Sequence, residues 1–280
     1  IAVINNIDFE HIDCYKSLED LKGAFIQFAN SVPFYGMVSI CKDSKNAASI
    51  IPLIDKPVVT YGIESDDVDF KAINIAHQDG TISFELVYKD RSYPFEMSVP
   101  GSYNILNALA AISVCKTMGL KIEDISSSLK SFSGVKRRFD VKIHSEDLTI
   151  IDDYAHHPVE VSSVIKAVKD NWDRRLLVVF QPHLFSRTKQ FFKEFALSLS
   201  DADVIFITEI FASREKLDNS INSEKITTYL QKLNHRNTLN ITTDTLLDEV
   251  KKHYEKGDII LTIGAGNIWR YADKLSESMT

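Results

Sequence analysis

Apolar residues in the first half of the chain recur with two different periods. Residues 17–29 repeat leucine and phenylalanine at helical spacing, so a helix is predicted there. Residues 58–99 alternate apolar and polar side chains around an Asp-Gly and a Lys-Asp turn, which predicts antiparallel hairpins. An alanine-rich stretch over residues 104–118 is followed by a glycine and predicts a second helix. The first half therefore reads as mixed α/β.

Short and almost uninterrupted apolar runs dominate the second half. They are LTIID, LLVVFQ, DVIFIT and DIILTIGAG, and each is flanked by helix-like segments. This is the pattern of parallel strands covered on both faces, so a doubly wound, mostly parallel sheet is predicted. The pattern changes near GVKRRFD, residues 134–140, and we place a boundary there between a domain 1–136 and a domain 137–280.

Polar clusters follow several of these apolar runs. DDYAHHP comes after LTII, QPHLFSRT after LLVVF, and GAGN after DIILTI. In an open parallel sheet, ligands bind beyond the carboxyl ends of the strands. The recurrence of polar residues at these ends predicts a ligand site at one edge of the sheet.

DDYAHHP leaves two interpretations open. Asp152 or Asp153 could bind a ribose or a cation, and His156 could bind an anion or carry a proton. Zinc is disfavoured because the side chains of His156 and His157 diverge. The alternative is a capped helix start with Pro158 in the first turn.

QPHLFSRT and GVKRRFD are also ambiguous. His183 and Arg187 suit a small carboxylate or phosphate, but Ser186 as an ordinary helix cap explains the stretch as well. The basic cluster of GVKRRFD is either a solvated linker or a source of a hinge arginine for a nucleotide phosphate. GAGN lacks the third glycine of a dinucleotide fingerprint, so close backbone packing is the better explanation.

Two stretches of the first half carry oxygen and amide groups. NIDFEHIDCY contains one imidazole, His11, among carboxylates, which suits Mg²⁺ or a plain polar loop. Asn104 and Asn107 stand one turn apart at a helix start, where they could bind an adenine or a phosphate, or cap the helix.

Composition excludes several classes of protein. The net charge of −7 argues against a broad nucleic-acid surface. The cysteines Cys14, Cys41 and Cys115 form no CxxC pair, so neither a zinc site nor a disulfide framework is indicated, and a reducing cytoplasm fits best. No signal peptide and no apolar run long enough for a membrane span is visible.

Taken together and in this order, the stretches resemble the Mur ligases, the ATP-dependent amide-forming enzymes of peptidoglycan synthesis. The resemblance rests on NIDFEHIDCY, GSYNILNALAA, GVKRRFD, DDYAHHPVEV, FQPHLFSRT and GDIILTIGAGNIW, and it spans essentially the whole chain. DDYAHHP with FQPH-x-x-SRT is specific for the alanine-adding type. The resemblance implies part of a P-loop-type central ATPase domain followed by the doubly wound C-terminal domain.

The resemblance also implies a reaction: ATP phosphorylates the carboxylate of UDP-N-acetylmuramate, and the amine of L-alanine attacks the acyl phosphate. It assigns Arg138 and His156 to catalysis, and Mg²⁺ to His11. The nucleotide contacts it implies are Asn104, Asn107, Arg138 and Asp153. The amino-acid contacts it implies are Tyr154, His156, His183 and Arg187. Nucleic acid and membrane insertion are not expected.

Three departures from the family pattern are visible. No G-x-x-x-x-G-K-[ST] occurs, so we expect the family's P-loop lysine to lie before Ile1 and the chain to be an N-terminally truncated fragment, inactive alone. Leu184 stands where many relatives carry arginine, which increases the demand on Arg187 or shifts the role elsewhere. A carbamylated lysine is not predicted, because residues 24–30 contain no lysine.

Three rivals remain. A recycling ligase joins a preformed peptide to the same UDP-sugar, and DDYAHHP with SRT argues against it. Folylpolyglutamate synthetase shares the architecture but has other signatures. A non-catalytic binding module is disfavoured by intact polar clusters at all three strand ends, although only activity excludes it.

Overall fold

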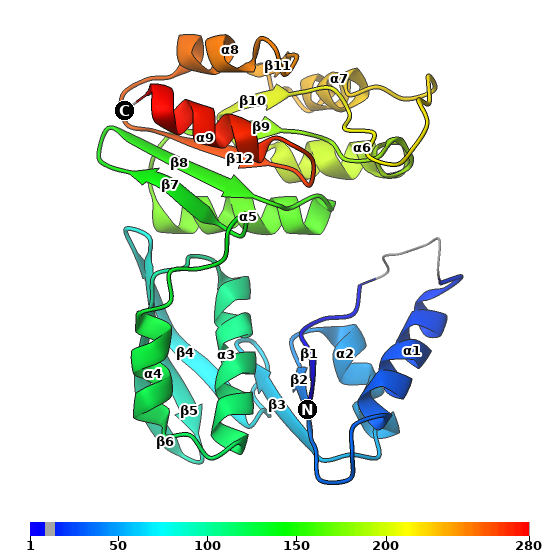
Figure 1. The fold of residues 1–280 in the computed structure, drawn as a ribbon, viewed down its shortest axis with the longest axis vertical. Coiled ribbons are helices and arrows are strands. Elements are labelled where there is room, and N and C mark those ends of the chain that lie inside the picture. Colours follow the sequence, from blue (N-terminus) through cyan, green and yellow to red (C-terminus); the bar gives the residue numbers. More distant parts are fainter. Residues whose placement is uncertain (9–14, 280) are drawn as a thin grey trace. The chain divides into compact units, whose positions relative to one another are not determined.

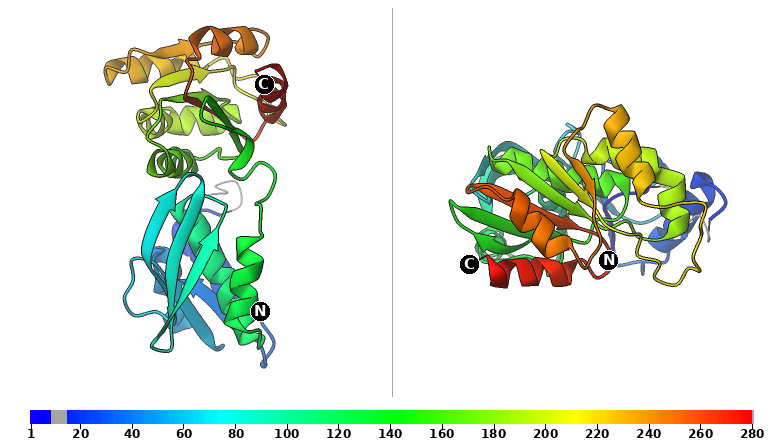
Figure 2. Two further views of the ribbon diagram at one scale, coloured as in Figure 1. Left: turned by 90° about the vertical axis from the view of Figure 1, so that its left-hand side faces the viewer. Right: turned by 90° about the horizontal axis from the view of Figure 1, so that it is seen from above.

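The computed structural model describes residues 1–8 and 15–279. The chain forms two compact units, Ile1–Phe132 and Ser133–Thr280, shown in Figure 1 and, from two further sides, in Figure 2. Each has its own sheet and core. The predicted His11 lies outside the described residues.

The first unit is built on a six-stranded sheet in which the strands follow one another in sequence order. The strands are β1 (Ala2–Ile4), β2 (Val38–Cys41), β3 (Val58–Gly62), β4 (Phe70–Gln78), β5 (Thr81–Tyr88) and β6 (Arg91–Met97). Neighbouring pairs from β1 to β4 are parallel, and β4, β5 and β6 form antiparallel hairpins. The helices are α1 (Leu18–Asn30), α2 (Lys45–Ile50), α3 (Ser102–Thr117) and α4 (Ile122–Lys130), with a short 3₁₀ turn η1 (Ile51–Leu53).

The predicted hairpins are confirmed for β4 to β6 but the prediction was wrong for β3. This strand is parallel to both of its neighbours. It meets β4 only at its carboxyl end, through Tyr61↔Phe70 and Gly62↔Lys71, so a short connection suffices for the parallel pairing. The predicted helices are present as α1 and α3. Ser17 caps α1 by accepting a hydrogen bond from the Asp20 N–H at 3.1 Å.

The second unit is the predicted doubly wound sheet, with strand order β11-β10-β9-β12-β8-β7. Its strands are β7 (Asp140–His144), β8 (Leu148–Asp153), β9 (Leu176–Phe180), β10 (Val204–Ile207), β11 (Thr238–Asn240) and β12 (Asp258–Ile263). All pairs are parallel except β7 with β8. The helices are α5 (Pro158–Asn171), α6 (Phe185–Leu199), α7 (Glu224–Lys232), α8 (Leu246–His253) and α9 (Trp269–Ser278).

Helices cover both faces of this second sheet, which explains its continuously apolar strands. Helices α8 and α9 pack on one face through Leu246, Val250, Ala272 and Leu275, and α5 and α6 lie on the other (Figure 2). Every residue of β8, β9, β10 and β12 is buried. Two-sided burial leaves the carboxyl edge of the sheet as the place where polar side chains can meet.

Within the described part of the chain, no helix combines the length and the hydrophobicity that crossing a membrane requires.

Candidate functional site

The predicted site edge exists in the second unit. Strands β9, β12 and β8 are neighbours in the sheet, and Ile263 of β12 is in register with both Asp153 of β8 and Phe180 of β9. The polar clusters that follow these strands therefore begin side by side. The prediction that they meet at one edge is confirmed.

Imidazole and guanidinium groups gather at this edge. The ring of His156 lies 5.3 Å from that of Tyr154 and 6.1 Å from that of His183, measured between centroids. Arg187, one helical turn after His183, places its Nη1 atom 3.4 Å from His183 Nδ1. All four predicted amino-acid contacts are thus brought together, while the identity of their ligand stays a prediction.

Of the two interpretations of DDYAHHP, the capped helix start is confirmed, and the binding role of Asp152, Asp153 and His156 stays a prediction. Helix α5 begins at Pro158, and the Glu160 carboxylate accepts from the N–H groups of His156 and His157 at 2.8 and 3.1 Å. This is the capped helix start. Nδ1 of the His156 ring lies 3.4 Å from the same Glu160 carboxylate and, closer still, 3.0 Å from the Tyr154 carbonyl oxygen. A carbonyl only accepts, so Nδ1 carries the proton and Nε2 is the acceptor of neutral His156.

The hydrogen-bond geometry also defines the state of His183. Arg187 can only donate, so His183 Nδ1 is the acceptor of that contact. Burial, followed by the charge of Arg187, lowers the pKa of His183 from 6.5 to about 4. The ring is therefore neutral at physiological pH and presents an Nε2–H donor.

Acid is expected to destabilise the second unit through His183. The unfolded chain takes up the proton near pH 6.5 and the folded chain only near pH 4. The free energy of unfolding is therefore unaffected by His183 above pH 6.5 and decreases as the pH falls from 6.5 toward 4. The melting temperature, followed by tryptophan fluorescence, should fall more steeply over this range for wild type than for His183→Gln. Parallel curves would contradict the lowered pKa.

Asp153 joins the end of β8 to the GVKRRFD segment. Its side chain is 3% exposed and accepts from the Phe139 N–H at 2.7 Å and from the Ala155 N–H at 2.8 Å. Burial raises the pKa of Asp153 to about 6, against these donors and the charge of Arg138. The carboxylate holds the backbone next to Arg138, and each oxygen keeps a second lone pair. Its predicted contact with a ribose stays a prediction.

Arg137, which sequence reasoning left without a role, ties the same segment to two strands. Its Nη2 donates to the Gly264 carbonyl at 2.5 Å, and its Nε lies 3.6 Å from the Oδ2 of the fully buried Asp152. Its guanidinium also stacks 4.6 Å above the Tyr154 ring. No local pattern signals this role, because it depends on contacts with β8 and the turn after β12.

Arg138 differs from its neighbour in being exposed. Its guanidinium lies 5.3 Å from the centre of the Tyr154 ring, and its backbone lies between Arg137 and Phe139, which both have positive φ. Non-glycine residues in this conformation cost about 1–3 kcal/mol each and persist where surrounding contacts enforce them. The segment is therefore a rigid support that presents the Arg138 side chain to solvent.

Close packing accounts for the glycines of GAGN, as predicted. A Cβ on Gly264 would lie 2.7 Å from the Gln181 carbonyl oxygen, and one on Gly266 would lie 2.3 Å from Gln181 Oε1. Gln181 itself bonds to Asn267, at 2.8 Å, and to the Ile268 N–H. The turn thus packs against the end of β9.

Ser186 is not the cap of α6, so that alternative was wrong. The helix begins at Phe185 after Leu184, which has a positive φ and a buried side chain. Ser186 instead donates through both its N–H and its hydroxyl to the carboxylate of Glu215. The serine is engaged by the loop after β10, a tertiary contact that a local pattern cannot reveal.

In the first unit, the predicted amides of Asn104 and Asn107 are hydrogen-bonded in series with a third amide, Asn5, which was not predicted. Tyr61 donates to Asn5 and Asn5 to Asn107, each at 2.7 Å, and Asn107 donates to Asn104 at 3.2 Å. Asn104 donates to the Pro100 carbonyl at 2.6 Å. Each of the three amides donates one N–H within this series. Its second N–H remains as a donor for a nucleotide.

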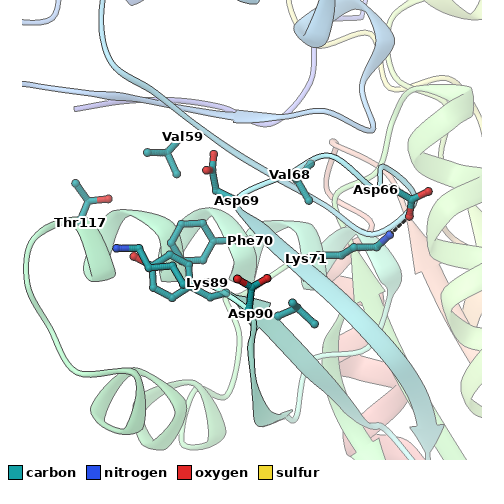
Figure 3. Close-up of a pocket in the computed structure, with 11 residues that line it drawn as sticks. Val59, Asp66, Val68, Asp69, Phe70, Lys71, Lys89, Asp90 and Thr117 are labelled. Atoms are coloured by element: carbon teal, nitrogen blue, oxygen red, sulfur yellow. Dashed lines mark hydrogen bonds and ion pairs between the residues drawn. The ribbon is translucent and has the colours of Figure 1, made fainter.

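A hollow in the first unit lies apart from these amides. Figure 3 shows Phe70 among charged side chains that include Asp69, Lys89 and Asp90, with Lys71 paired to Asp66. None of the predicted contacts lines it. Among the described residues, no group of three or more His, Cys, Asp or Glu side chains could hold a metal ion.

Comparison with known proteins links both units to one family. Residues 1–115 match the Mur ligase middle domain, and residues 137–266 match the domain described as Mur ligase, glutamate ligase domain. Two relatives, from Geotalea uraniireducens strain Rf4 and Geotalea daltonii, are called UDP-N-acetylmuramate–L-alanine ligase. They are 41% identical over 285 residues and 40% identical over 281 residues. Each match takes in 100% of this chain and 61% of the relative, so the chain spans about three fifths of their length.

Solved structures of similar fold span more than one activity. A UDP-N-acetylmuramate-alanine ligase from Thermotoga maritima has a TM-score of 0.79 at 24% identity, covering 99% of this chain and 59% of that one. A murein peptide ligase from Psychrobacter arcticus has a TM-score of 0.63 at 19% identity, covering 100% of this chain and 58% of that one. At these identities the likeness establishes the fold alone.

Proposed function

The chain belongs to the Mur ligase family, and we propose from this that a protein containing it joins L-alanine to UDP-N-acetylmuramate with ATP as the energy source. The observation that supports the alanine-adding activity best is about 40% identity to enzymes of that name over the whole chain. The gathering of Tyr154, His156, His183 and Arg187 at the carboxyl edge of the second sheet supplies a matching site.

The proposed reaction has two steps. The γ-phosphoryl group of ATP passes to the muramate carboxylate, which gives an acyl phosphate and ADP. The amine of L-alanine then attacks the acyl carbon, and phosphate leaves as the amide forms. Phosphoryl transfer depends mainly on positioning and on neutralising charge. We assign that task to Arg138, whose exposed guanidinium projects from a rigid segment.

His156 is proposed as the proton acceptor for the amine. An ammonium group cannot attack, so L-alanine must lose a proton before or during the bond-forming step. Nδ1 of His156 is fixed as a donor to the Tyr154 carbonyl, which leaves Nε2 to receive that proton. Neutral His183 and cationic Arg187 lie next to it and suit the carboxylate of the same amino acid.

The first unit is proposed as part of the ATPase domain and the second as the amino-acid domain. Asn104 and Asn107 retain amide donors for the nucleotide, and Asp153 a lone pair on each oxygen for its ribose. Mg²⁺, with His11 as a ligand, completes the proposal, because a divalent cation lowers the repulsion between the phosphates.

The assay that tests this function measures phosphate release by the full gene product with ATP, Mg²⁺ and UDP-N-acetylmuramate. We expect turnover on addition of L-alanine and none on addition of the tripeptide L-Ala-D-Glu-diaminopimelate. Turnover with the tripeptide alone would assign the protein to the recycling branch. Absence of turnover with either would favour the binding module.

A further inference from the structure

The loop that follows β10 is fastened to the start of α6 at two points. At the first, the Phe211 N–H donates to the Pro182 carbonyl at 2.8 Å and the Leu184 N–H donates to the Phe211 carbonyl at 3.0 Å. The Phe211 ring also stacks on His183, 5.9 Å between centroids and 15° between planes. At the second, Glu215 accepts from the Ser186 N–H and hydroxyl.

Arg214 stands between these two points in a tight turn. The Glu215 N–H donates to the Ala212 carbonyl at 3.0 Å, which closes the turn, and Ser213 within it has a positive φ of 51°. A serine in this conformation is strained and persists because both flanks are held. The backbone of Arg214 is therefore fixed beside the start of α6, where His183 and Ser186 lie. The side chain of Arg214 is exposed.

Positive side chains outnumber negative ones around His183. Arg187 contacts the ring, and Arg214 adds the smallest of the effects that lower the pKa of His183, after burial, Arg187 and His156. Glu215 brings one negative charge, which acts to raise this pKa, and accepts two hydrogen bonds from Ser186, so two guanidinium groups stand against one carboxylate. Within residues 1–8 and 15–279, neither Arg187 nor Arg214 takes part in an ion pair with a carboxylate. Two guanidinium groups beside a neutral imidazole form a site for an anion.

We propose that Arg214, together with Arg187, binds the carboxylate of the incoming amino acid. This assignment rests on the proposed function and extends it to a residue that the sequence motifs do not include. Arg187 has its Nη1 turned toward His183, which leaves other N–H groups for one carboxylate oxygen, and Arg214 binds the second. Leu184 supplies no charge here, because its side chain is aliphatic, and that side chain is buried. The pair makes a free carboxylate a requirement of the substrate.

The test compares Arg214→Ala with Lys216→Ala, which removes an exposed cation two residues further along the same loop. In the full gene product, Arg214→Ala should raise the KM for L-alanine about 10- to 100-fold, the effect of one charge-assisted hydrogen bond. The KM for ATP should not change, and Lys216→Ala should match wild type. Arg214→Lys should recover part of the loss.

L-Alaninamide separates carboxylate binding from a general effect on the loop. It lacks the carboxylate, so its affinity, measured as a substrate or a competitive inhibitor, should be the same for wild type and Arg214→Ala. An equal loss for both ligands, or an equal rise in the KM for ATP, would show that Arg214 acts on the structure of the loop. Unchanged alanine kinetics in Arg214→Ala would overturn the inference alone, whereas a wild type without alanine-dependent turnover would overturn the proposed function as well.

Discussion

Replacing Arg138 by alanine is expected to lower kcat of the full gene product by about 10³-fold or more, the scale at which arginines that stabilise phosphoryl transfer act. The side chain is exposed, so the accompanying fall in stability, from losing its charge near Asp153, should be small. Its backbone is held by the Asp153 bond to Phe139 and by the contacts of Arg137, which keeps the side chain in place. Phosphate release at saturating substrates measures the effect.

Lys136→Ala is the matched control for this prediction. Lys136 is also an exposed cation and lies two residues earlier in the same segment, so it tests whether net charge alone matters. We expect its kcat to stay within a few fold of wild type. Arg138→Lys should fall between the two variants, because an ammonium keeps the charge but not the planar fork. Equal losses in Arg138→Ala and Lys136→Ala would remove the specific role of Arg138.

The architecture of the second unit was predictable because its strands are buried on both faces. Among the strands of the second unit, the continuous apolar runs predicted β8, β9, β10 and β12 and missed the other two. Strand β7 has two of its five residues exposed and pairs antiparallel with a register shift, and β11 spans Thr238–Asn240 alone, so neither left an apolar run. In the first unit, β3 was wrongly assigned to the hairpins, because alternation does not reveal strand direction.

The site was predictable as far as it follows from strand order. His156 and His183 come together because each follows a parallel strand, β8 or β9, on either side of β12. The supporting residues were not predictable. Asn5, Arg137, Phe211 and Glu215 act through contacts with distant segments, and nothing in their local sequence indicates the partner. The sequence thus located the side chains that gather at the sheet edge better than the side chains that hold them in place.

Arg137→Met is expected to destabilise the second unit by about 3–5 kcal/mol, the usual cost of leaving one partner of a buried ion pair alone. Asp152 is fully buried, and apart from Arg137 its carboxylate has the Thr262 hydroxyl, which donates to Oδ1 at 2.6 Å. Both tryptophans, Trp172 and Trp269, lie in this unit, so urea unfolding followed by their fluorescence reports on it. Lys169→Met, which breaks the exposed pair with Asp203, should cost less than about 1 kcal/mol.

A second variant separates the unpaired charge from lost packing. Burial already raises the pKa of Asp152, with Thr262 and Arg137 acting against it, so loss of Arg137 should raise this pKa further. A carboxyl whose pKa is raised in the folded state favours folding when protonated, so Arg137→Met should lose stability as the pH rises through that pKa. Adding Asp152→Asn removes the charge while keeping an oxygen for Thr262. The double variant should therefore recover most of the stability and lose the pH dependence, and if it stays as unstable as Arg137→Met, the contacts of Arg137 with Gly264 and Tyr154 carry the energy instead.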